Sequence, residues 1–392
     1  MTTIAFSILV ASLRGTEVAI YDYAVANEEI LHNKSIILIQ MSHDHNEQVI
    51  KKFRERFEVY FYTLVEDIEK IMKLCKCKVL YTIAYGERRV NDPTLSVNGV
   101  YKTALHCVFS MSDPHADTYI PISEYLAEKY NADKNAVVPH MISLKVDNYS
   151  KSEVSCNHDT SSNNIETVSR SSDLPNYVTH NSYCNDTTLR NKLCIPSDAI
   201  VFGRHGGYET FNIPFVHQVI ASVISKNSDS KSSRLREDLH NTSCCDIYFI
   251  FVNTYKFMDH PRVKFLPPIT SDEDKLSFIL SCDAMIHARA DGETFGIACG
   301  EFSVCNKPVI TCVCGDTAHI DILGKKCIKY ANSTELENIL TNFKEIKRKK
   351  EEELKNNVSH KNEMWNAYSQ KYSARPIIDL WWKYLIEPCV QK

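Results

Sequence analysis

Short apolar runs alternate with longer amphipathic stretches along most of the 392-residue chain. Apolar runs of about four to eight residues are typical of buried strands, and apolar residues at every third or fourth position are typical of helices. In residues 64–75, for example, Leu64, Ile68, Ile71 and Cys75 share one helical face. The strands that this pattern predicts are 3–10, 35–39, 59–62, 79–83, 104–109 and 119–123, followed by 199–202, 246–252, 263–266, 283–287 and 309–311. Strands that alternate with helices in this way predict parallel sheets.

Polar stretches divide this α/β pattern into two Rossmann-like halves. Residues 146–192 are rich in Ser, Asn, Asp and Thr and show no periodicity, so we expect a disordered or loosely held insertion. We therefore expect a first domain over residues 1–145 and a second over 193–365, followed by a C-terminal helix within 366–392. A second polar stretch covers 226–243.

The composition is that of a water-soluble globular protein, with 44% apolar and 24% charged residues. The net charge of -4 argues against a general nucleic-acid binder, because such proteins usually carry a basic surface. No apolar run approaches the length of about 18 residues that a membrane span requires. Residues 1–13 are apolar but lack the positive start of a signal peptide, and we interpret them as a buried first strand.

The 15 cysteines form an odd set with irregular spacing, which fits a full set of disulfides poorly. The pairs Cys75/Cys77 and Cys312/Cys314 lack a second pair at the spacing of a zinc finger. We therefore expect buried free thiols in the reducing cytoplasm.

The segment 287–311 is the strongest candidate for a functional site. Its pattern predicts a loop, a helix and a strand, and it contains two glutamates eight residues apart. Glu293 falls in the loop, and Glu301 falls in a helix that is expected to begin near Gly296. The expected donors at the start of this helix are the amides of Thr294, Phe295 and Gly296. A carboxylate beside such donors suits a phosphorylated ligand with vicinal hydroxyls. On spacing alone, an ordinary loop with two surface glutamates remains an open alternative.

This segment resembles the Glu-x7-Glu signature of the retaining GT-B glycosyltransferases. The resemblance rests on His287, Glu293, Phe295-Gly296, Glu301 and Pro308-Val309-Ile310. It implies two Rossmann-like domains that face a cleft, with a C-terminal helix that crosses back to the first domain. It also implies that Glu293 is catalytic, in contact with the transferred sugar, and that Glu301 binds the nucleotide ribose.

The same resemblance assigns further residues. It places Gly15 near the donor phosphates, while Arg14 and Glu17 are interpreted as parts of an ordinary strand-to-helix turn. Arg204 follows a strand and would bind the diphosphate. The family has a lysine about five residues later, where this chain has Glu209.

The resemblance also bears on two histidines of the first domain, His106 and His140. His106 is interpreted either as a core histidine bonded to a backbone carbonyl or as a catalytic residue that faces the donor sugar. Val137-Val138-Pro139-His140 resembles the segment that closes the first domain in the family, with His140 in place of an asparagine.

The resemblance implies transfer of a sugar from a nucleoside diphosphate sugar to an acceptor hydroxyl, with retention and without a metal or other cofactor. The Asp-x-Asp spacing at Asp272-Glu273-Asp274 is interpreted as a helix start capped by Ser271. The acceptor, whether glycan, protein or small molecule, is not readable from the sequence. One alternative is an inactive protein of this fold that binds a nucleotide sugar or acts as a scaffold. A second is an epimerase or phosphorylase of the same fold.

Overall fold

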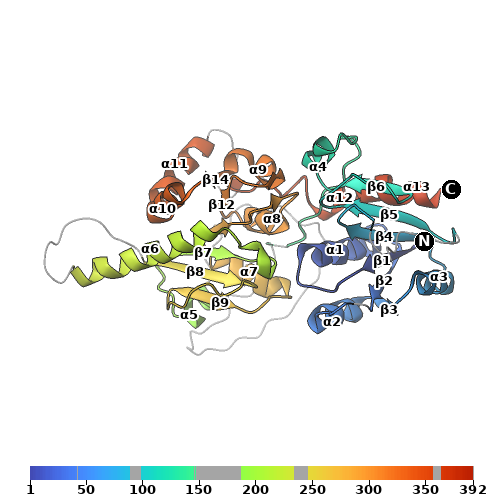
Figure 1. The fold of residues 1–392 in the computed structure, drawn as a ribbon, viewed down its shortest axis with the longest axis horizontal. Helices are drawn as coiled ribbons and strands as arrows, with labels where there is room; N and C mark the ends of the chain where they lie inside the picture. Colours follow the sequence, from blue (N-terminus) through green and yellow to red (C-terminus); the bar gives the residue numbers. More distant parts are fainter. Residues whose placement is uncertain are drawn as a thin grey trace, which may run out of the picture.

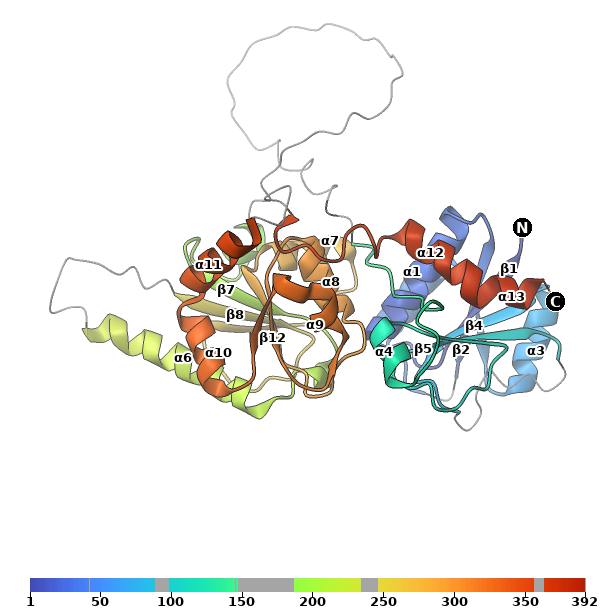
Figure 2. The same cartoon turned by 90° about the horizontal axis from the view of Figure 1, so that it is seen from above.

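The computed structural model describes residues 1–41, 43–88, 99–144, 146, 187–233, 246–355 and 363–391. They form two α/β lobes that lie side by side (Figures 1 and 2). Residues 147–186 of the predicted insertion lie outside the described residues. Its last six residues are not a loose linker, because α5 (Thr187–Lys192) is a helix that is anchored by the buried Arg190. The Arg190 guanidinium donates to the Ser281 carbonyl at 2.8 Å and to Asp283 at 3.0 Å.

The first lobe is built on a parallel six-stranded sheet with the order β3-β2-β1-β4-β5-β6. Its strands are β1 (Thr3–Ile8), β2 (Lys34–Gln40), β3 (Glu58–Tyr62), β4 (Val79–Ala84), β5 (Lys102–Cys107) and β6 (Thr118–Pro121). Its helices are α1 (Gly15–Glu29), α2 (Glu47–Arg56), α3 (Val65–Leu74) and α4 (Glu124–Lys129). The central strands are buried and mostly apolar because helices cover both faces of the sheet.

The second lobe repeats this arrangement with the order β14-β12-β10-β7-β8-β9, again parallel. Its strands are β7 (Ile200–Arg204), β8 (Ile247–Val252), β9 (Val263–Leu266), β10 (Ala284–His287), β12 (Val309–Cys312) and β14 (Cys327–Tyr330). Its helices are α6 (Pro214–Ser233), α7 (Asp272–Leu280), α8 (Ile297–Val304), α9 (Ala318–Leu323), α10 (Ser333–Thr341) and α11 (Phe343–Lys355), besides α5. A separate short pair joins β11 (Gly292–Glu293) to β13 (Asp316–Thr317).

Both sheets share one doubly wound topology. Read from β9, the second sheet has the same order as the first, with the first strand of each lobe next to its fourth. The strand order therefore reverses between β1 and β4 and again between β7 and β10. In open α/β sheets a ligand binds outside the carboxyl ends of the strands at such a reversal. The topology alone directs attention to the loops after β1, β7 and β10.

Several element boundaries differ from the sequence prediction. Helix α6 continues to Ser233, into the second polar stretch, 226–243. Residues 333–355 form two helices, α10 and α11, separated at Asn342. Strand β14 and helix α9 were not predicted, because each is too short to show a clear period. In the described part of the chain, no helix is long and apolar enough to cross a membrane.

The C-terminal segment returns to the first lobe, as predicted. Helix α12 (Ala374–Trp381) lies against α1, as Figure 2 shows. A π-helical turn over Trp382–Ile386 then runs along β5 and β6 to α13 (Glu387–Val390), which lies against β5. The fully buried Trp381 stacks on Phe6, with ring centroids 5.8 Å apart, and on Tyr23 at 5.9 Å. Trp382 is only partly buried. Of the two adjacent tryptophans, Trp381 therefore holds this helix in place.

We predict that Trp381→Ala lowers the free energy of unfolding by about 3–5 kcal/mol, because it leaves a cavity among packed rings. The matched control is Trp382→Ala, which removes the same side chain from a partly exposed site and should cost much less. Urea denaturation followed by circular dichroism measures both. Equal losses for the two variants would contradict the packing role of Trp381.

Candidate active site in the cleft between the lobes

A cleft lies between the two lobes, at the carboxyl ends of both sheets. It consists of two adjoining pockets, here named after the glutamates that line them, the Glu293 pocket and the Glu301 pocket. The residues that line both are Arg14, Gly15, His205, Gly206, Ile297 and Ala298. These come from the loop after β1, the loop after β7 and the start of α8. The cleft therefore forms where the reversal of strand order predicts a ligand site.

Two helix N-termini meet in this cleft. Helix α1 begins at Gly15 and helix α8 at Ile297, and a Cβ atom built on Gly15 would lie 3.4 Å from the Ile297 side chain. The amides in the first turn of a helix lack partners within the helix, and the helix dipole adds partial positive charge there. Two such ends, one from each lobe, form a place suited to an anion such as phosphate.

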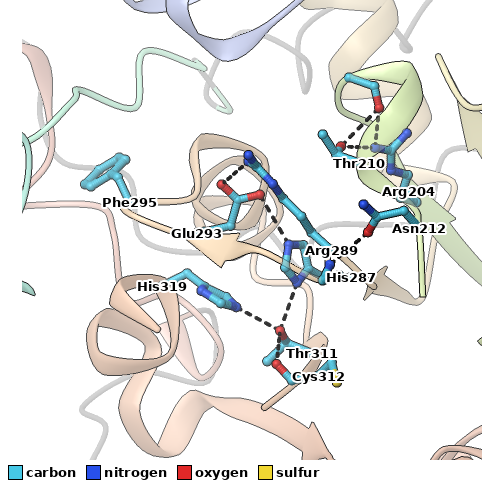
Figure 3. A network of polar contacts seen from close by, with 12 residues as sticks. Arg204, Thr210, Asn212, His287, Arg289, Glu293, Phe295, Thr311, Cys312 and His319 are labelled. Carbon is cyan, nitrogen blue, oxygen red and sulfur yellow. Dashed lines mark hydrogen bonds and ion pairs between the residues drawn. The ribbon is translucent and has the colours of Figure 1, made fainter. Parts of the chain in front are cut away.

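Glu293 is held at the end of a chain of polar contacts that runs through the second lobe (Figure 3). Its carboxylate lies 3.3 Å from His287 Nε2 and 3.2 Å from Arg289 Nη1. The other nitrogen of His287 lies 2.9 Å from the Thr311 hydroxyl, which lies 2.8 Å from His319 Nε2. Because an ionised carboxylate only accepts, His287 Nε2 donates to Glu293. The Thr311 hydroxyl donates to the Cys312 carbonyl at 3.4 Å and so links both histidines to the end of β12.

The ionisation of Glu293 follows from these contacts. Burial alone would raise its pKa, but the hydrogen bond from His287 and the charge of Arg289 outweigh burial and lower the pKa to about 2. Burial also lowers the pKa of His319 to about 3, so this histidine stays neutral. At neutral pH Glu293 is therefore a fixed anion in the wall of its pocket, able to accept hydrogen bonds from ligand hydroxyls.

Glu301 lies in the other pocket and is also ionised. Lys275 Nζ donates to one carboxylate oxygen at 2.7 Å, and His205 Nε2 lies 3.1 Å from the other. Burial would raise the pKa of Glu301, but the charges of Lys275 and His205 lower it to about 2. Each carboxylate oxygen can accept a second hydrogen bond. Its predicted contact with a ribose remains a prediction.

Arg204 is buried, and both of its terminal nitrogens donate to protein oxygens. Its guanidinium donates to the carbonyls of Asn253 and Gly207, at 2.9 and 2.7 Å, and to the hydroxyls of Thr254 and Thr210. Burial lowers its pKa to about 10, so it remains charged. Arg204 lines the Glu293 pocket and contributes positive charge there. Direct contact with a diphosphate would require it to exchange some of these bonds.

The histidine that the first lobe presents to the cleft is His140. His106, the predicted catalytic histidine, lies behind it, fully buried, with Nε2 2.6 Å from the Val138 carbonyl and Nδ1 2.8 Å from the Tyr81 hydroxyl. Of the described residues that line the Glu293 pocket, His140 belongs to this lobe and His106 is absent. This geometry favours the core interpretation of His106. His140 is 3% exposed and its Nδ1 has no hydrogen-bond partner.

Thr294, Phe295 and Gly296 line the Glu293 pocket, but they are not the first turn of the helix. Helix α8 starts one residue later, because Gly296 adopts the left-handed conformation with φ 85°. The first-turn amides are therefore those of Ile297, Ala298 and Cys299. Phe295 packs edge-on against His140, with ring centroids 5.6 Å apart, and so joins the two lobes.

Two site residues were missed or left without a role in the sequence analysis. Lys275 carried no signal, because its position shows only that it belongs to a helix. His140 stood out as a replacement for the usual asparagine, and this was the signal that could have been followed. Among the described residues, no group of three or more His, Cys, Asp or Glu side chains could hold a metal ion.

Comparisons with known proteins agree on the architecture. No protein-family model and no curated protein matches the sequence. The crystal structure of HepE from Anabaena in complex with UDP-glucose superposes with a TM-score of 0.63 at 14% identity, over 97% of this chain and 98% of HepE. A glycosyltransferase from Rickettsia africae gives 0.56 at 12% identity, over 100% and 96% of the two chains.

A UDP complex of MnaA from S. aureus gives a TM-score of 0.55 at 12% identity, over 97% of this chain and 94% of MnaA. The chain has the GT-B fold. The fold implied by the Glu-x7-Glu resemblance is thus confirmed. Identities this low establish only the fold, so the roles of Glu293 and Glu301 must be argued from the site itself.

Burial of His140 predicts a pH dependence of stability. Burial lowers its pKa from 6.5 to about 3, so acid protonates this residue in the unfolded chain first. Above pH 6.5 the ionisation of His140 costs the folded state nothing, because the residue is neutral in both states. As the pH falls from 6.5 toward 3, the unfolded chain gains a proton that the folded state does not, so the free energy of unfolding decreases. Between pH 7.5 and 5.5 wild type should lose about 1.4 kcal/mol more stability than His140→Phe.

Urea denaturation at the two pH values measures this difference. The stability of His140→Phe at pH 7.5 gives the packing cost of the substitution and serves as the internal control. His106, which contacts His140 and has its own pKa lowered well below the usual value by burial, is retained in both proteins. Identical losses in wild type and variant would contradict the assignment.

Proposed function

We propose that this protein is a glycosyltransferase that transfers a sugar from a nucleoside diphosphate sugar to an acceptor hydroxyl. The observation that carries this proposal is the cleft itself, where two opposed helix N-termini lie between two ionised glutamates. The helix ends suit a diphosphate. The carboxylates suit hydroxyl groups on either side of it, those of a sugar at Glu293 and those of a ribose at Glu301.

Within this proposal, Glu293 is the residue that contacts the transferred sugar. A fixed carboxylate both orients sugar hydroxyls and stabilises positive charge that develops at the reacting carbon. The leaving diphosphate would be stabilised by first-turn amides and by the charge of Arg204. Because these groups are supplied by the protein, we propose a reaction without a metal. Retention of configuration is proposed from the resemblance of the Glu293–Glu301 segment, and no protein nucleophile is assigned.

UDP is the nucleotide that we propose for the donor. HepE and MnaA, whose folds match along almost the whole chain, form complexes with UDP-glucose and with UDP respectively. In this chain the Glu301 pocket is also lined by Phe278, Ile269 and Thr270, from the segments that follow β9. An apolar wall beside backbone groups suits a flat nucleobase. The acceptor would enter from the first lobe.

A second candidate is a protein that binds a nucleotide sugar without turnover. The observation that favours it is the chemistry around the phosphate position, where Glu209 replaces the expected lysine and Arg204 is occupied by protein oxygens. This candidate predicts donor binding with neither transfer nor hydrolysis. Incubation with UDP-glucose and a panel of glycan acceptors, followed by measurement of released UDP, separates the two candidates.

We expect UDP to stabilise the protein in a thermal-shift screen of UDP, GDP, ADP, TDP and CMP. A ligand at about 100 times its Kd adds roughly 2.7 kcal/mol to the native state. For a chain of this size that corresponds to about 5 °C or less. The screen is run in EDTA and again with added Mg²⁺, so that it also tests the proposed metal independence. A chain that responds to none of the five nucleotides would contradict both candidate functions.

Substitution of the two glutamates should separate turnover from nucleotide binding. We expect Glu293→Ala and Glu293→Gln to lower kcat about 100-fold, equivalent to roughly 2.7 kcal/mol, with little change in the Kd for UDP. Glu301→Gln should instead raise the Kd about tenfold, since about one hydrogen bond to a charged group is lost. Steady-state kinetics and calorimetric titration with UDP measure the two effects.

The Glu301 variant is glutamine because its amide oxygen still accepts from Lys275, which alanine would leave buried without a partner. Unfolding transitions of all variants are recorded to exclude a folding defect. Small and equal effects at both positions would rule out the proposed site.

A further inference from the structure

We propose that Arg14, from the first lobe, supplies the positive charge that the donor diphosphate needs and that the second lobe lacks at Glu209. This inference rests on the proposed function and adds a residue to it. In the ligand-free protein Arg14 is paired with Glu209 across the cleft. The diphosphate takes the place of that carboxylate when the donor binds.

The other cations that line the cleft within the described residues are already engaged. Lys275 is bonded to Glu301, and Arg204 donates to four protein oxygens. Arg289 donates to Glu293 at 3.2 Å and lies over the ring of Phe109. Lys52 donates to the Thr270 carbonyl at 3.3 Å. Each is held in place by these contacts, and movement toward a ligand would break them.

Arg14 differs from them in both exposure and partner. Its side chain is 64% exposed, and its guanidinium lies 2.6 Å from Glu209, whose side chain is 49% exposed. An exposed ion pair of this kind contributes little to stability, so a ligand anion can replace it at small cost. A guanidinium can also bind phosphate through two parallel hydrogen bonds. The carboxylate of Glu209 occupies the place that a phosphate would take.

The position of Arg14 in the fold suits this role. Arg14 is the N-cap residue of α1, and its side chain makes no capping hydrogen bond to the helix. It lines both pockets, next to Gly15 and opposite the first turn of α8. A cation at this point would bind the same anion as the two sets of first-turn amides. The charge would come from the first lobe, whereas Arg204 belongs to the second.

The pairing also accounts for Glu209. A carboxylate five residues after Arg204 would repel a diphosphate if it stood alone in the second lobe. Paired with Arg14, it holds the guanidinium in the cleft before the ligand arrives. The positive charge that a lysine at position 209 would supply to the diphosphate thus comes from Arg14, on the opposite side of the cleft.

Calorimetric titration of the full chain with UDP and with uridine tests this inference, because the ratio of the two affinities isolates the contribution of the phosphates. We expect R14A to lower the ratio at least tenfold with uridine binding unchanged, and R14K to retain most of it. E209K in the R14A background should restore the ratio, since it returns a cation to the second lobe. E209Q should bind UDP more tightly than wild type.

The outcomes distinguish this inference from the proposed function. A wild-type ratio in R14A overturns the role of Arg14, and so does an equal loss of UDP and uridine binding. Weaker binding of UDP by E209Q overturns the role of Glu209 as a displaceable partner. If wild type binds neither UDP nor uridine, the proposed function fails and this inference fails with it.

Discussion

The cleft is organised by two helix N-termini that approach each other from different lobes. Helices α1 and α8 bring unpaired amides and partial positive charge to one place, with Gly15 and Ile297 almost in contact. Two positive ends so close together are unfavourable unless negative charge lies near them. The protein provides part of that charge through buried carboxylates, and an anionic ligand would provide the rest. This constraint links the topology of both sheets to the chemistry of the site.

The two glutamates of the same short segment stay ionised for different reasons. Glu293 is held by His287 and Arg289 at the end of a chain that closes on a neutral histidine, whereas Glu301 is held by a lysine and a histidine. Both have pKa values of about 2, so neither can donate a proton near neutral pH. Their chemistry is that of fixed acceptors and fixed negative charge. That role fits a reaction in which positive charge develops on a sugar.

The sequence predicted most strands and the Glu293–Glu301 segment, because strands buried on both faces must be apolar throughout and the segment is local. It could not separate His106 from His140, since both are histidines beside apolar runs and only tertiary packing decides which one faces the cleft. Lys275 was missed because its partner Glu301 lies on another helix. Arg204 was expected to follow its strand and is instead the last residue of β7, and the oxygens that surround it come from loops that the pattern does not position.

Glu209, which stands where a lysine was expected, shows that the charge of a site between two lobes depends on residues from both lobes and cannot be judged from one segment of the sequence. Within the second lobe alone, Glu209 is a loss of positive charge and suggests a damaged phosphate site. Across the cleft it is the partner of Arg14, at 2.6 Å, and the pair keeps a guanidinium beside both helix ends. The pairing exists only while the lobes hold this relation to each other. A ligand that draws Arg14 away from Glu209 would therefore remove a contact between the lobes as well as change the local charge.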